Sequence, residues 1–292
     1  GLVPLRDFIV LDAQPGPGAT WRNGWEFMTV ARALDVGTLS DLPGQEDLGI
    51  AFRPTPALVR DVAPELWRRY EDAYELFVMR PAVVTRVDPI RWNEDLLVTA
   101  RFGRGKRTRE RTFRTRLILN ATGSWSSPFV PWYPGMDRFE GKMAHAYRLP
   151  PLGDFTGQRV LVVGGGRSAV HLLLELERRG IETVWSTRRD PDFHMRPTFA
   201  LARSGKPTVG EFAGLPRARR LAERGKRLPS DVSLRGLPLT PMVFDAIRRG
   251  TLHSQGPLIS FGTHSAVLAG GRSVRIDAVL WATGGRESVR HL

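Results

Sequence analysis

Cysteine is absent from the 292 residues of the chain. Disulfides, thiolate nucleophiles, iron–sulfur clusters and cysteine-ligated zinc are therefore excluded. No apolar run approaches the roughly 18 residues that a membrane span needs. The first residues, Gly1–Asp7, do not show the basic segment followed by an apolar one that marks a signal peptide. Together these absences fit a cytoplasmic protein that does not associate with membranes.

Several catalytic signatures are also missing. The sequence contains no H-E-x-x-H, no G-x-S-x-G and no P-loop. Five of the six histidines, namely His171, His194, His253, His264 and His291, show no metal-ligand spacing. We therefore predict no metal site.

The charge is strongly one-sided. Lys and Arg number 43 against 30 Asp and Glu, which gives a formal net charge of +13. The basic residues are densest between Arg188 and Arg227. Such a run could bind nucleic acid, but it is more often solvated surface, and phosphorylated cofactors also favour a basic protein. We expect no nucleic acid as the biological partner.

Length and local patterns indicate an α/β protein of about two domains. Spacings near four predict helical structure over 55–78, kinked or divided at Pro64. Residues 124–157, rich in Pro, Gly and aromatics, predict a linker, and 241–249 predict a helix. Short apolar, β-branched runs predict strands at 7–12, 83–87, 96–100, 117–119 and 278–284.

The clearest unit lies between residues 158 and 190. A strand at 159–163 leads into the turn Gly164-x-Gly166-x-x-Ala169, a helix at 170–179 and a strand at 183–187. This pattern matches the dinucleotide fingerprint: the first Gly permits a tight turn, the second lets the backbone approach a pyrophosphate, and a small third residue allows close helix packing. We therefore predict a dinucleotide site here.

The end of the second strand indicates which nucleotide is bound. A carboxylate there would bind the ribose 2′-hydroxyl of NAD, but this sequence has Arg188 and Arg189, with Arg188 22 residues beyond Gly166. Guanidinium groups suit a 2′-phosphate because they donate a planar fork of hydrogen bonds and keep their charge. The sequence therefore favours NADPH.

Asp12 and two short repeats indicate a second nucleotide site. A strand that ends in an acid is how a first dinucleotide site holds an adenosine ribose, but no glycine turn precedes Asp12. We therefore expect the chain to be cut inside its first βαβ unit, with at least about 15 residues missing. Asn120–Gly123 and Trp281–Gly284 both follow an apolar strand and read Ala-Thr-Gly at their ends. Two copies suggest two nucleotide-binding units that cross over one another.

The whole chain resembles the flavin-containing monooxygenases and their Baeyer–Villiger relatives, which bind two dinucleotides. The motifs that carry the resemblance stand in the family's order: Asp12, Gly18-Ala19-Thr20-Trp21-Arg22, Ala121-Thr122-Gly123, Phe139-x-Gly141-x-x-x-His145, Gly164–Ala169 with Arg188 and Arg189, and Ala282-Thr283-Gly284. The sequence departs from the family in three places. The first G-x-G-x-x-G is missing, Leu149 replaces an aromatic, and only eight residues follow Gly284.

The resemblance implies a set of site residues. His145 would belong to the fingerprint that couples the two domains. The implied cofactor-binding residues are Asp12, Gly18, Thr20, Trp21, Arg22, Val84, Ala121, Thr122, Gly123, Gly164, Gly166, Arg167, Ser168, Ala169, Arg188, Arg189, Ala282, Thr283 and Gly284.

The resemblance also implies an architecture of two Rossmann-like domains. An NADPH domain, 155–276, would be inserted into an FAD domain, 1–145 plus 277–292, which carries a β-rich insert at about 82–119. The strands ending at Asp12, Asn120 and Trp281 would then share one assembly. The strands ending at Val163 and Thr187 would form a separate parallel sheet.

The implied activity is an FAD- and NADPH-dependent oxidoreductase. NADPH would reduce the flavin, and oxygen from a flavin-peroxide would pass to a small organic substrate, which explains why no acid–base pair stands out. Two alternatives stay open: a flavin-dependent NADPH reductase without oxygen transfer, and a non-catalytic nucleotide- or nucleic-acid-binding protein. Whether the chain forms a homo-oligomer also stays open.

Overall fold

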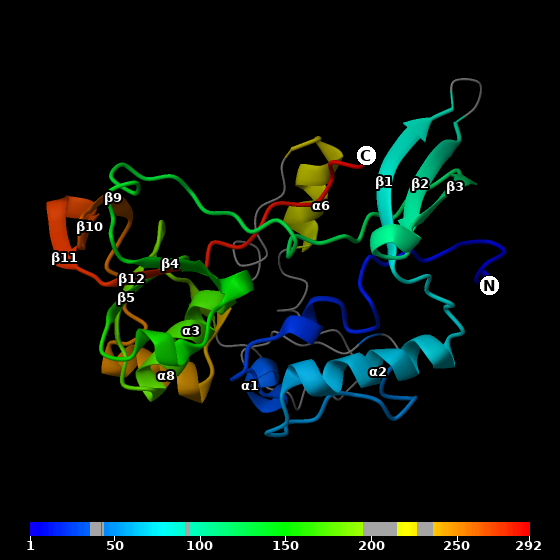
Figure 1. The fold of residues 1–292 in the computed structure, drawn as a ribbon. Coiled ribbons are helices and arrows are strands. Elements are labelled where there is room, and N and C mark those ends of the chain that lie inside the picture. Colours follow the sequence, from blue (N-terminus) through cyan, green and yellow to red (C-terminus); the bar gives the residue numbers. More distant parts are fainter. Residues whose placement is uncertain (36–41, 43, 91–93, 195–214, 227–235) are drawn as a thin grey trace. The chain divides into compact units, whose positions relative to one another are not determined.

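The computed structural model describes residues 1–35, 42, 44–90, 94–194, 215–226 and 236–292 (Figure 1). They form two compact units. The first comprises Gly1–Leu34, Leu39–Ser127 and Gly285–Leu292, and the second comprises Asp35–Thr38 and Pro128–Gly284. No helix within the described residues combines the length and apolar character needed to cross a bilayer.

A four-stranded parallel sheet organises the second unit. Its order is β4 (Lys142–His145), β12 (Ala278–Trp281), β5 (Arg159–Val163) and β6 (Glu182–Ser186). Trp281 lies opposite both His145 and Val163, and Val163 lies opposite Ser186. The carboxyl ends of all four strands therefore meet at one edge of the sheet, where ligands of open α/β sheets bind.

Helix α3 (Arg167–Arg178) connects β5 to β6 and packs on both strands. Its predicted apolar stripe is fully buried, with Leu172, Leu173 and Leu176 shielded from solvent. Gly180, with φ +68°, follows the helix end, as the sequence predicts for a C-terminal stop. The strand–turn–helix–strand prediction is confirmed, although α3 begins three residues earlier than expected.

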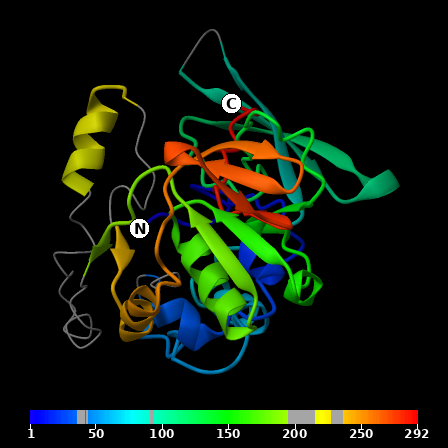
Figure 2. The ribbon, with the colours of Figure 1, turned by 90° about the vertical axis from the view of Figure 1, so that its left-hand side faces the viewer.

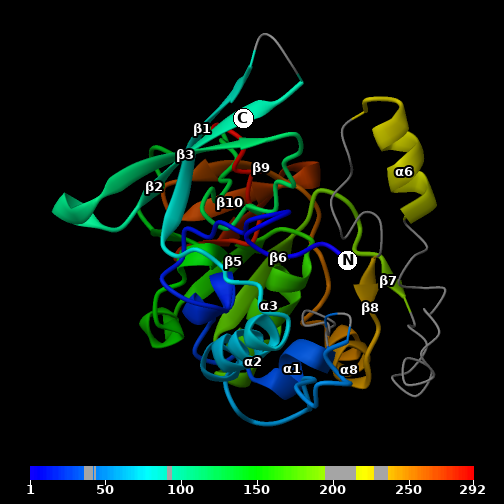
Figure 3. The same cartoon turned by 90° about the vertical axis from the view of Figure 1, so that its right-hand side faces the viewer.

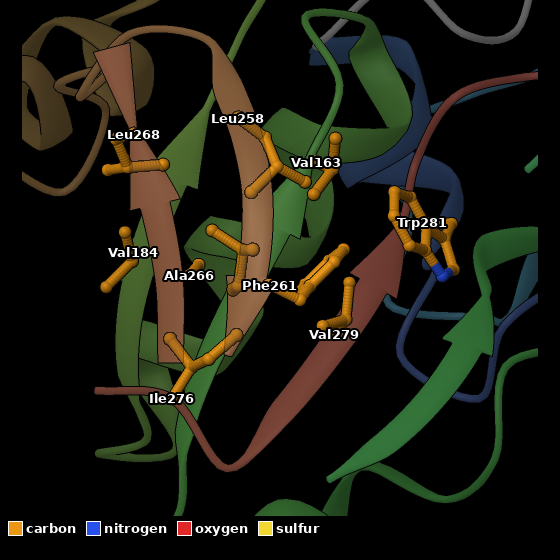
Figure 4. Close-up of a cluster of buried hydrophobic side chains, with 10 residues drawn as sticks. Val163, Val184, Leu258, Phe261, Ala266, Leu268, Ile276, Val279 and Trp281 are labelled. Carbon is orange, nitrogen blue, oxygen red and sulfur yellow. The ribbon is translucent and has the colours of Figure 1, made fainter. Parts of the chain in front are cut away.

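A three-stranded antiparallel sheet covers one face of the parallel strands. It consists of β9 (Leu258–Gly262), β10 (Ser265–Leu268) and β11 (Arg272–Arg275). Figure 1 shows it on the side of the parallel sheet opposite α3. The apolar side chains between the two sheets form one buried cluster (Figure 4), made of Leu161, Val163, Val184, Leu258, Phe261, Ala266, Leu268, Ile276, Val279 and Trp281.

The remaining described elements of the second unit are short. They are η3 (Ala146–Arg148), η4 (Leu152–Phe155), α6 (Leu215–Glu223), α8 (Pro241–Arg249), η5 (Ala269–Gly271) and two paired strands. The paired strands are β7 (Phe193–His194) and β8 (Leu237–Pro238), which are labelled in Figure 3. The helix predicted at 241–249 is confirmed with its exact bounds. Its N-cap Thr240 accepts a hydrogen bond from the Val243 amide, and Gly250, with φ +87°, ends it.

The first unit combines helices with an antiparallel meander. The helices are η1 (Ala19–Asn23), α1 (Val30–Asp35) and α2 (Val59–Ala73). The meander consists of β1 (Ala82–Pro89), β2 (Leu96–Phe102) and β3 (Arg109–Thr115), with η2 (Gly105–Arg107) in the turn between β2 and β3. Ala82, Val98 and Ala100 lie on one face and are buried, and Thr99, which points to the other face, is buried as well.

Two predicted strands of the first unit do not form. Residues 7–12 make only two isolated bridges, Phe8 with Pro4 and Leu11 with Met79. Residues 117–119 lie outside any strand, and the side chains of Leu117 and Leu119 are 71% and 86% exposed. An apolar run becomes a strand only when neighbours pair with its backbone, and the described chain supplies no ladder here.

Two other expectations also need correction. The sequence predicts a kink at Pro64 or two shorter helices; α2 continues through Pro64 as one helix, so the division into two helices is wrong. The predicted linker 124–157 contains β4, which pairs along its length with β12.

The most consequential correction concerns the strand that ends at Trp281. The sequence predicts it in one assembly with the strands ending at Asp12 and Asn120, apart from the sheet of Val163 and Thr187. The structure instead places β12 between β4 and β5, inside that parallel sheet (Figure 2). Its four residues are all buried, as the central position of a parallel strand demands.

The start of β4 requires a glycine, and this generates a prediction. A Cβ atom at Gly141 would lie 2.3 Å from Phe139 Cζ and 2.4 Å from the Asp277 carbonyl oxygen. We expect Gly141→Ala to lower the free energy of unfolding by about 1–3 kcal/mol, the usual effect of overpacking. The control is Gly153→Ala, where an added Cβ meets nothing within 4 Å. Denaturant unfolding of both variants measures the difference, and equal stability would contradict the geometry.

Candidate functional site

The glycine turn after β5 packs closely against the ends of β12 and β6. Gly164 has φ +133°, and a Cβ atom there would lie 2.3 Å from the carbonyl oxygen of Ala282, just beyond β12. On the other side, the Gly164 amide donates to the Ser186 carbonyl (2.9 Å), and the indole Nε1 of Trp185 donates to the Gly164 carbonyl (2.7 Å). Only glycine fits this position, so the turn is fixed in place before any ligand binds.

The turn leads directly into the amino-terminal end of α3. Gly166 is the N-cap residue, and no side chain caps this end of the helix with a hydrogen bond. Ala169 is completely buried, which lets the helix pack closely on the sheet, as the fingerprint requires. Helix amino termini attract anions because unpaired amides and the helix dipole point toward them. Arg167 and Ser168 occupy the first two helical positions.

The arginine pair lies at the same edge of the sheet. Arg188 and Arg189 follow the end of β6, and both are exposed. Burial raises the pKa of the Tyr133 phenol, and the positive charge of Arg188 opposes that rise. Tyr133 itself stacks on Trp281 at the end of β12, with 6.0 Å between ring centroids and 10° between planes. The structure thus brings the predicted glycine turn and arginine pair to the ends of adjacent strands.

The second A-T-G sequence extends from β12 at this edge. Thr283 donates its hydroxyl hydrogen bond to the Phe129 carbonyl, and the Phe129 amide donates to the Gly284 carbonyl (3.0 Å). Gly284 has φ +71°, a conformation that favours glycine. Ala282–Gly284 therefore belongs to the second unit, fastened to the segment that begins it.

His145 lies beside this turn. The Tyr147 amide donates to His145 Nδ1 (3.0 Å), and the two rings meet edge to face at 4.8 Å. Burial lowers the pKa of His145, while the carbonyl groups of Gly284 and Phe129 oppose that change and the charge of Arg148 adds to it. The ring is therefore a buried, neutral imidazole whose proton sits on Nε2.

The predicted ribose acid of the first unit is already engaged. Asp12 accepts a hydrogen bond from the Gln14 amide through Oδ1 (2.9 Å) and contacts Arg80 Nε through Oδ2 (2.6 Å). Arg80 also forms a two-pronged ion pair with Glu71 of α2, at 2.6 Å on each arm. These three side chains are only 15–23% exposed. Arg80 gave no sequence signal, because its pairing with Asp12 joins residues 68 positions apart.

The other predicted residues of the first unit are dispersed over its elements. Gly18 has φ +94° and packs against Pro64 of α2, and Trp21 stacks on Trp67 of α2 at 6.5 Å. Arg22 donates to the Pro17 carbonyl, Thr20 lies in η1, and Val84 lies half-buried on β1.

The first A-T-G, Ala121–Gly123, lies in an exposed segment outside any strand. There Thr122 donates its hydroxyl to the Ser288 carbonyl (2.9 Å), and the Ser288 amide donates to the Gly123 carbonyl (3.2 Å). The two A-T-G repeats thus belong to different units.

Two further predictions concern metal ions and the basic stretch. The described residues contain no cluster of three or more His, Asp or Glu that could hold a metal ion. Four residues of the basic stretch, Arg196, Arg203, Lys206 and Arg227, lie outside the residues that the structure describes.

Comparisons with known proteins place the chain in a family. The sequence model of the family described as pyridine nucleotide-disulphide oxidoreductase matches residues 49–210, more than half of the chain. The chain therefore belongs to this family, although with no cysteine it has no counterpart of a redox disulfide in these 292 residues.

The curated proteins to which the chain is similar include monooxygenases. The chain is 29% identical over 196 residues to a Baeyer-Villiger monooxygenase of Streptomyces coelicolor, covering 65% of this chain and 34% of that protein. It is 28% identical over 193 residues to a polycyclic ketone monooxygenase of Thermothelomyces thermophilus, covering 59% and 28%. It thus spans about a third of the length of these curated relatives.

A solved structure extends the similarity over the whole chain. The flavin-containing monooxygenase from Stenotrophomonas maltophilia matches with a TM-score of 0.68 and 27% identity, covering 98% of this chain and 73% of that chain. The predicted resemblance to this group of two-dinucleotide flavoproteins is confirmed, as is the α/β fold class.

The buried imidazole of His145 generates a prediction about pH. Its pKa is lowered in the folded state, so protonation disfavours folding. The contribution of the neutral His145 to the free energy of unfolding should be fully present above the unfolded-state pKa of about 6.5. It should be lost as pH falls from there to the lowered pKa of the folded state. We expect His145→Gln to remove this part of the pH dependence, measured as melting temperature between about pH 7.5 and pH 5. The exposed His253→Gln is the control, and parallel curves for His145→Gln and the original protein would contradict the assignment.

Proposed function

We propose that this chain is part of an FAD- and NADPH-dependent monooxygenase that acts on a small organic substrate with O₂. The observation that carries the proposal is the meeting of the Gly164 turn, the uncapped end of α3 and the Arg188–Arg189 pair at one sheet edge. The named relatives, all flavin or Baeyer–Villiger monooxygenases, support the oxygenase class.

The residues of the second unit fit NADPH. An added Cβ at Gly165 would approach only Thr187, at 3.6 Å, which leaves the outer side of the turn open to a ligand backbone. The pyrophosphate would lie on the amino-terminal end of α3, held by Gly166, Arg167 and Ser168. Arg188 and Arg189 would then bind the 2′-phosphate through charge-assisted hydrogen bonds.

The residues of the first unit fit FAD only in part. Asp12 could accept a ribose hydroxyl on the remaining lone pairs of its carboxylate, with Trp21, Arg22 and Ala121–Gly123 as further contacts. No glycine-rich phosphate turn precedes Asp12 in the sequence. We therefore assign to the described residues of the first unit a ribose-side contact for FAD.

When bound, FAD supplies the chemistry of hydride uptake from NADPH and of reaction with O₂. The contribution of this chain is orientation and electrostatics. The wedged Gly164 turn fixes the nucleotide along the sheet edge, and the arginine pair neutralises its 2′-phosphate. His145 is buried beside Ala282–Gly284. It would fix the position of the second A-T-G turn relative to β4 and would not contact the substrate.

Replacing both arginines tests the nucleotide assignment. We expect Arg188→Ala with Arg189→Ala to weaken NADPH binding by several kcal/mol, since charge-assisted hydrogen bonds contribute about 1.5–3 kcal/mol each, and to change NADH binding little. Calorimetric titration with both nucleotides measures this. Arg275→Ala, at another exposed arginine of the second unit, is the control. Equal losses for NADPH and NADH would show that the pair does not bind the 2′-phosphate.

Flavin content tests the first unit. We expect the 292-residue chain to keep well under one FAD per chain after desalting, because no phosphate turn precedes Asp12 and Arg80 already occupies one of its oxygens. Absorbance of the released flavin against protein concentration measures the ratio. Stoichiometric FAD would mean that another part of the chain binds the flavin phosphates.

Steady NADPH oxidation that yields only H₂O₂ in an FAD-loaded protein would favour a reductase instead.

A further inference from the structure

The carboxyl end of β6 is held by a segment far along the chain. Ser254 bridges to Trp185, and the Gln255 amide donates to the Trp185 carbonyl (2.8 Å). The Ser186 hydroxyl donates to the Gly256 carbonyl (2.8 Å). Each of the last residues of β6 thus has a partner in residues 254–256, although β6 is the edge strand of its sheet.

A hydroxyl pair continues this contact beyond the end of the strand. Thr187 Oγ1 and Ser254 Oγ lie 2.5 Å apart, and the Gly256 amide donates to Ser254 Oγ (3.2 Å). Thr187 is only 2% exposed, so its hydroxyl depends on this partner rather than on solvent. On its other side, the Thr187 methyl group faces Gly165 of the nucleotide turn.

Thr187 immediately precedes Arg188. The position of the Arg188 Cα atom follows from the backbone of Thr187, which is fixed on one side by the glycine turn and on the other by Ser254. Arg188 is exposed, so packing does not hold its side chain. The position of the Arg188 side chain therefore depends on where the backbone leaves the sheet. A binding residue whose supporting contacts are lost also loses affinity for its ligand.

We propose that Ser254 is a positioning residue for NADPH specificity. Through its hydrogen bond to Thr187 it sets the direction from which the Arg188 guanidinium meets the 2′-phosphate, without touching the nucleotide itself. This inference rests on the proposed NADPH site. It adds a determinant of specificity that lies 66 residues after Arg188 in a segment with no recognisable motif.

A loss of affinity confined to ligands with a 2′-phosphate distinguishes a positioning role of Ser254 from a general effect on stability. Ser254→Ala leaves the Thr187 hydroxyl buried without its partner, so the chain after Ser186 relaxes. Only the 2′-phosphate contact depends on Arg188, because the pyrophosphate lies on the turn and on α3. The variant should therefore lose affinity for ligands that carry a 2′-phosphate and keep its affinity for those that do not.

The experiment titrates the full chain with 2′,5′-ADP and with 5′-ADP by calorimetry. Ser254→Ala should weaken 2′,5′-ADP about three- to tenfold, the equivalent of one neutral hydrogen bond, and leave 5′-ADP within about twofold, the accuracy of such a comparison. Ser254→Thr keeps the hydroxyl and should restore binding. Ser273→Ala, on exposed β11, should change neither ligand. If Ser254→Ala does not fold, Thr187→Val removes the same hydrogen bond and takes its place.

A double-mutant cycle with Arg188→Ala shows whether Ser254 acts through the arginine. In the Arg188→Ala background, Ser254→Ala should produce a clearly smaller loss of 2′,5′-ADP affinity, because only the contact of Arg189 then remains to be displaced. A loss of the same size in both backgrounds, no loss at all, or an equal loss for 5′-ADP would each overturn the proposal. If the original protein binds 2′,5′-ADP no more tightly than 5′-ADP, the proposed NADPH site itself fails, whatever the variants do.

Discussion

The position of β12 between β4 and β5 is the constraint on which the site depends. It brings the Ala282 carbonyl so close to Gly164 that a Cβ atom there would lie within 2.3 Å of it. It also places Trp281 between His145 of β4 and Val163 of β5. The glycine turn, the second A-T-G and the histidine of the fingerprint consequently share one edge, although the second A-T-G lies more than 100 residues beyond the other two in the sequence. Packing of a central strand, rather than any single polar contact, assembles them.

The sequence could predict the elements whose partners lie nearby. The unit 159–187 was recognisable because strand, turn, helix and returning strand follow one another within 30 residues, and each has a local signature. Helix 241–249 likewise carries its own cap, proline and terminal glycine. The pairing of β12 was not predictable from its residues, because four apolar residues fit any buried parallel strand. The same limit explains residues 117–119, whose apolar pattern is real but whose backbone finds no ladder.

The site shows the same division between local and distant information. The glycines and the arginine pair were found because their spacing within one βαβ unit is characteristic. Ser254, Thr187 and Arg80 were missed because each matters through a partner far along the chain: Ser254 and Thr187 through each other, and Arg80 through Asp12. Asp12 shows the converse. Its position after an apolar run suggested a free ribose acid, and only the structure reveals that a guanidinium already shares it.

The fingerprint Phe139-x-Gly141-x-x-x-His145 has a physical basis in packing. Phe139 packs against the apolar cluster between the two sheets, meeting Phe261 at 5.3 Å. Gly141 admits the Asp277 carbonyl, and His145 ends β4 beside the second A-T-G. The motif therefore joins β4 to the start and the end of β12. These contacts tie the position of the A-T-G turn to the packing of the sheet.

The charges of the second unit divide into those that are neutralised and those that are not. Arg159 pairs with Glu182, Arg249 with Glu177, and Arg178 with the buried Glu175. Arg188 and Arg189 form no ion pair with the residues that the structure describes, and they lie at the same sheet edge as the amino-terminal end of α3. Positive potential from the helix dipole and from two unneutralised guanidinium groups therefore adds at this edge. A ligand with a pyrophosphate and a second phosphate on its ribose would engage both sources at once, whereas a ligand with the pyrophosphate alone would engage only the helix.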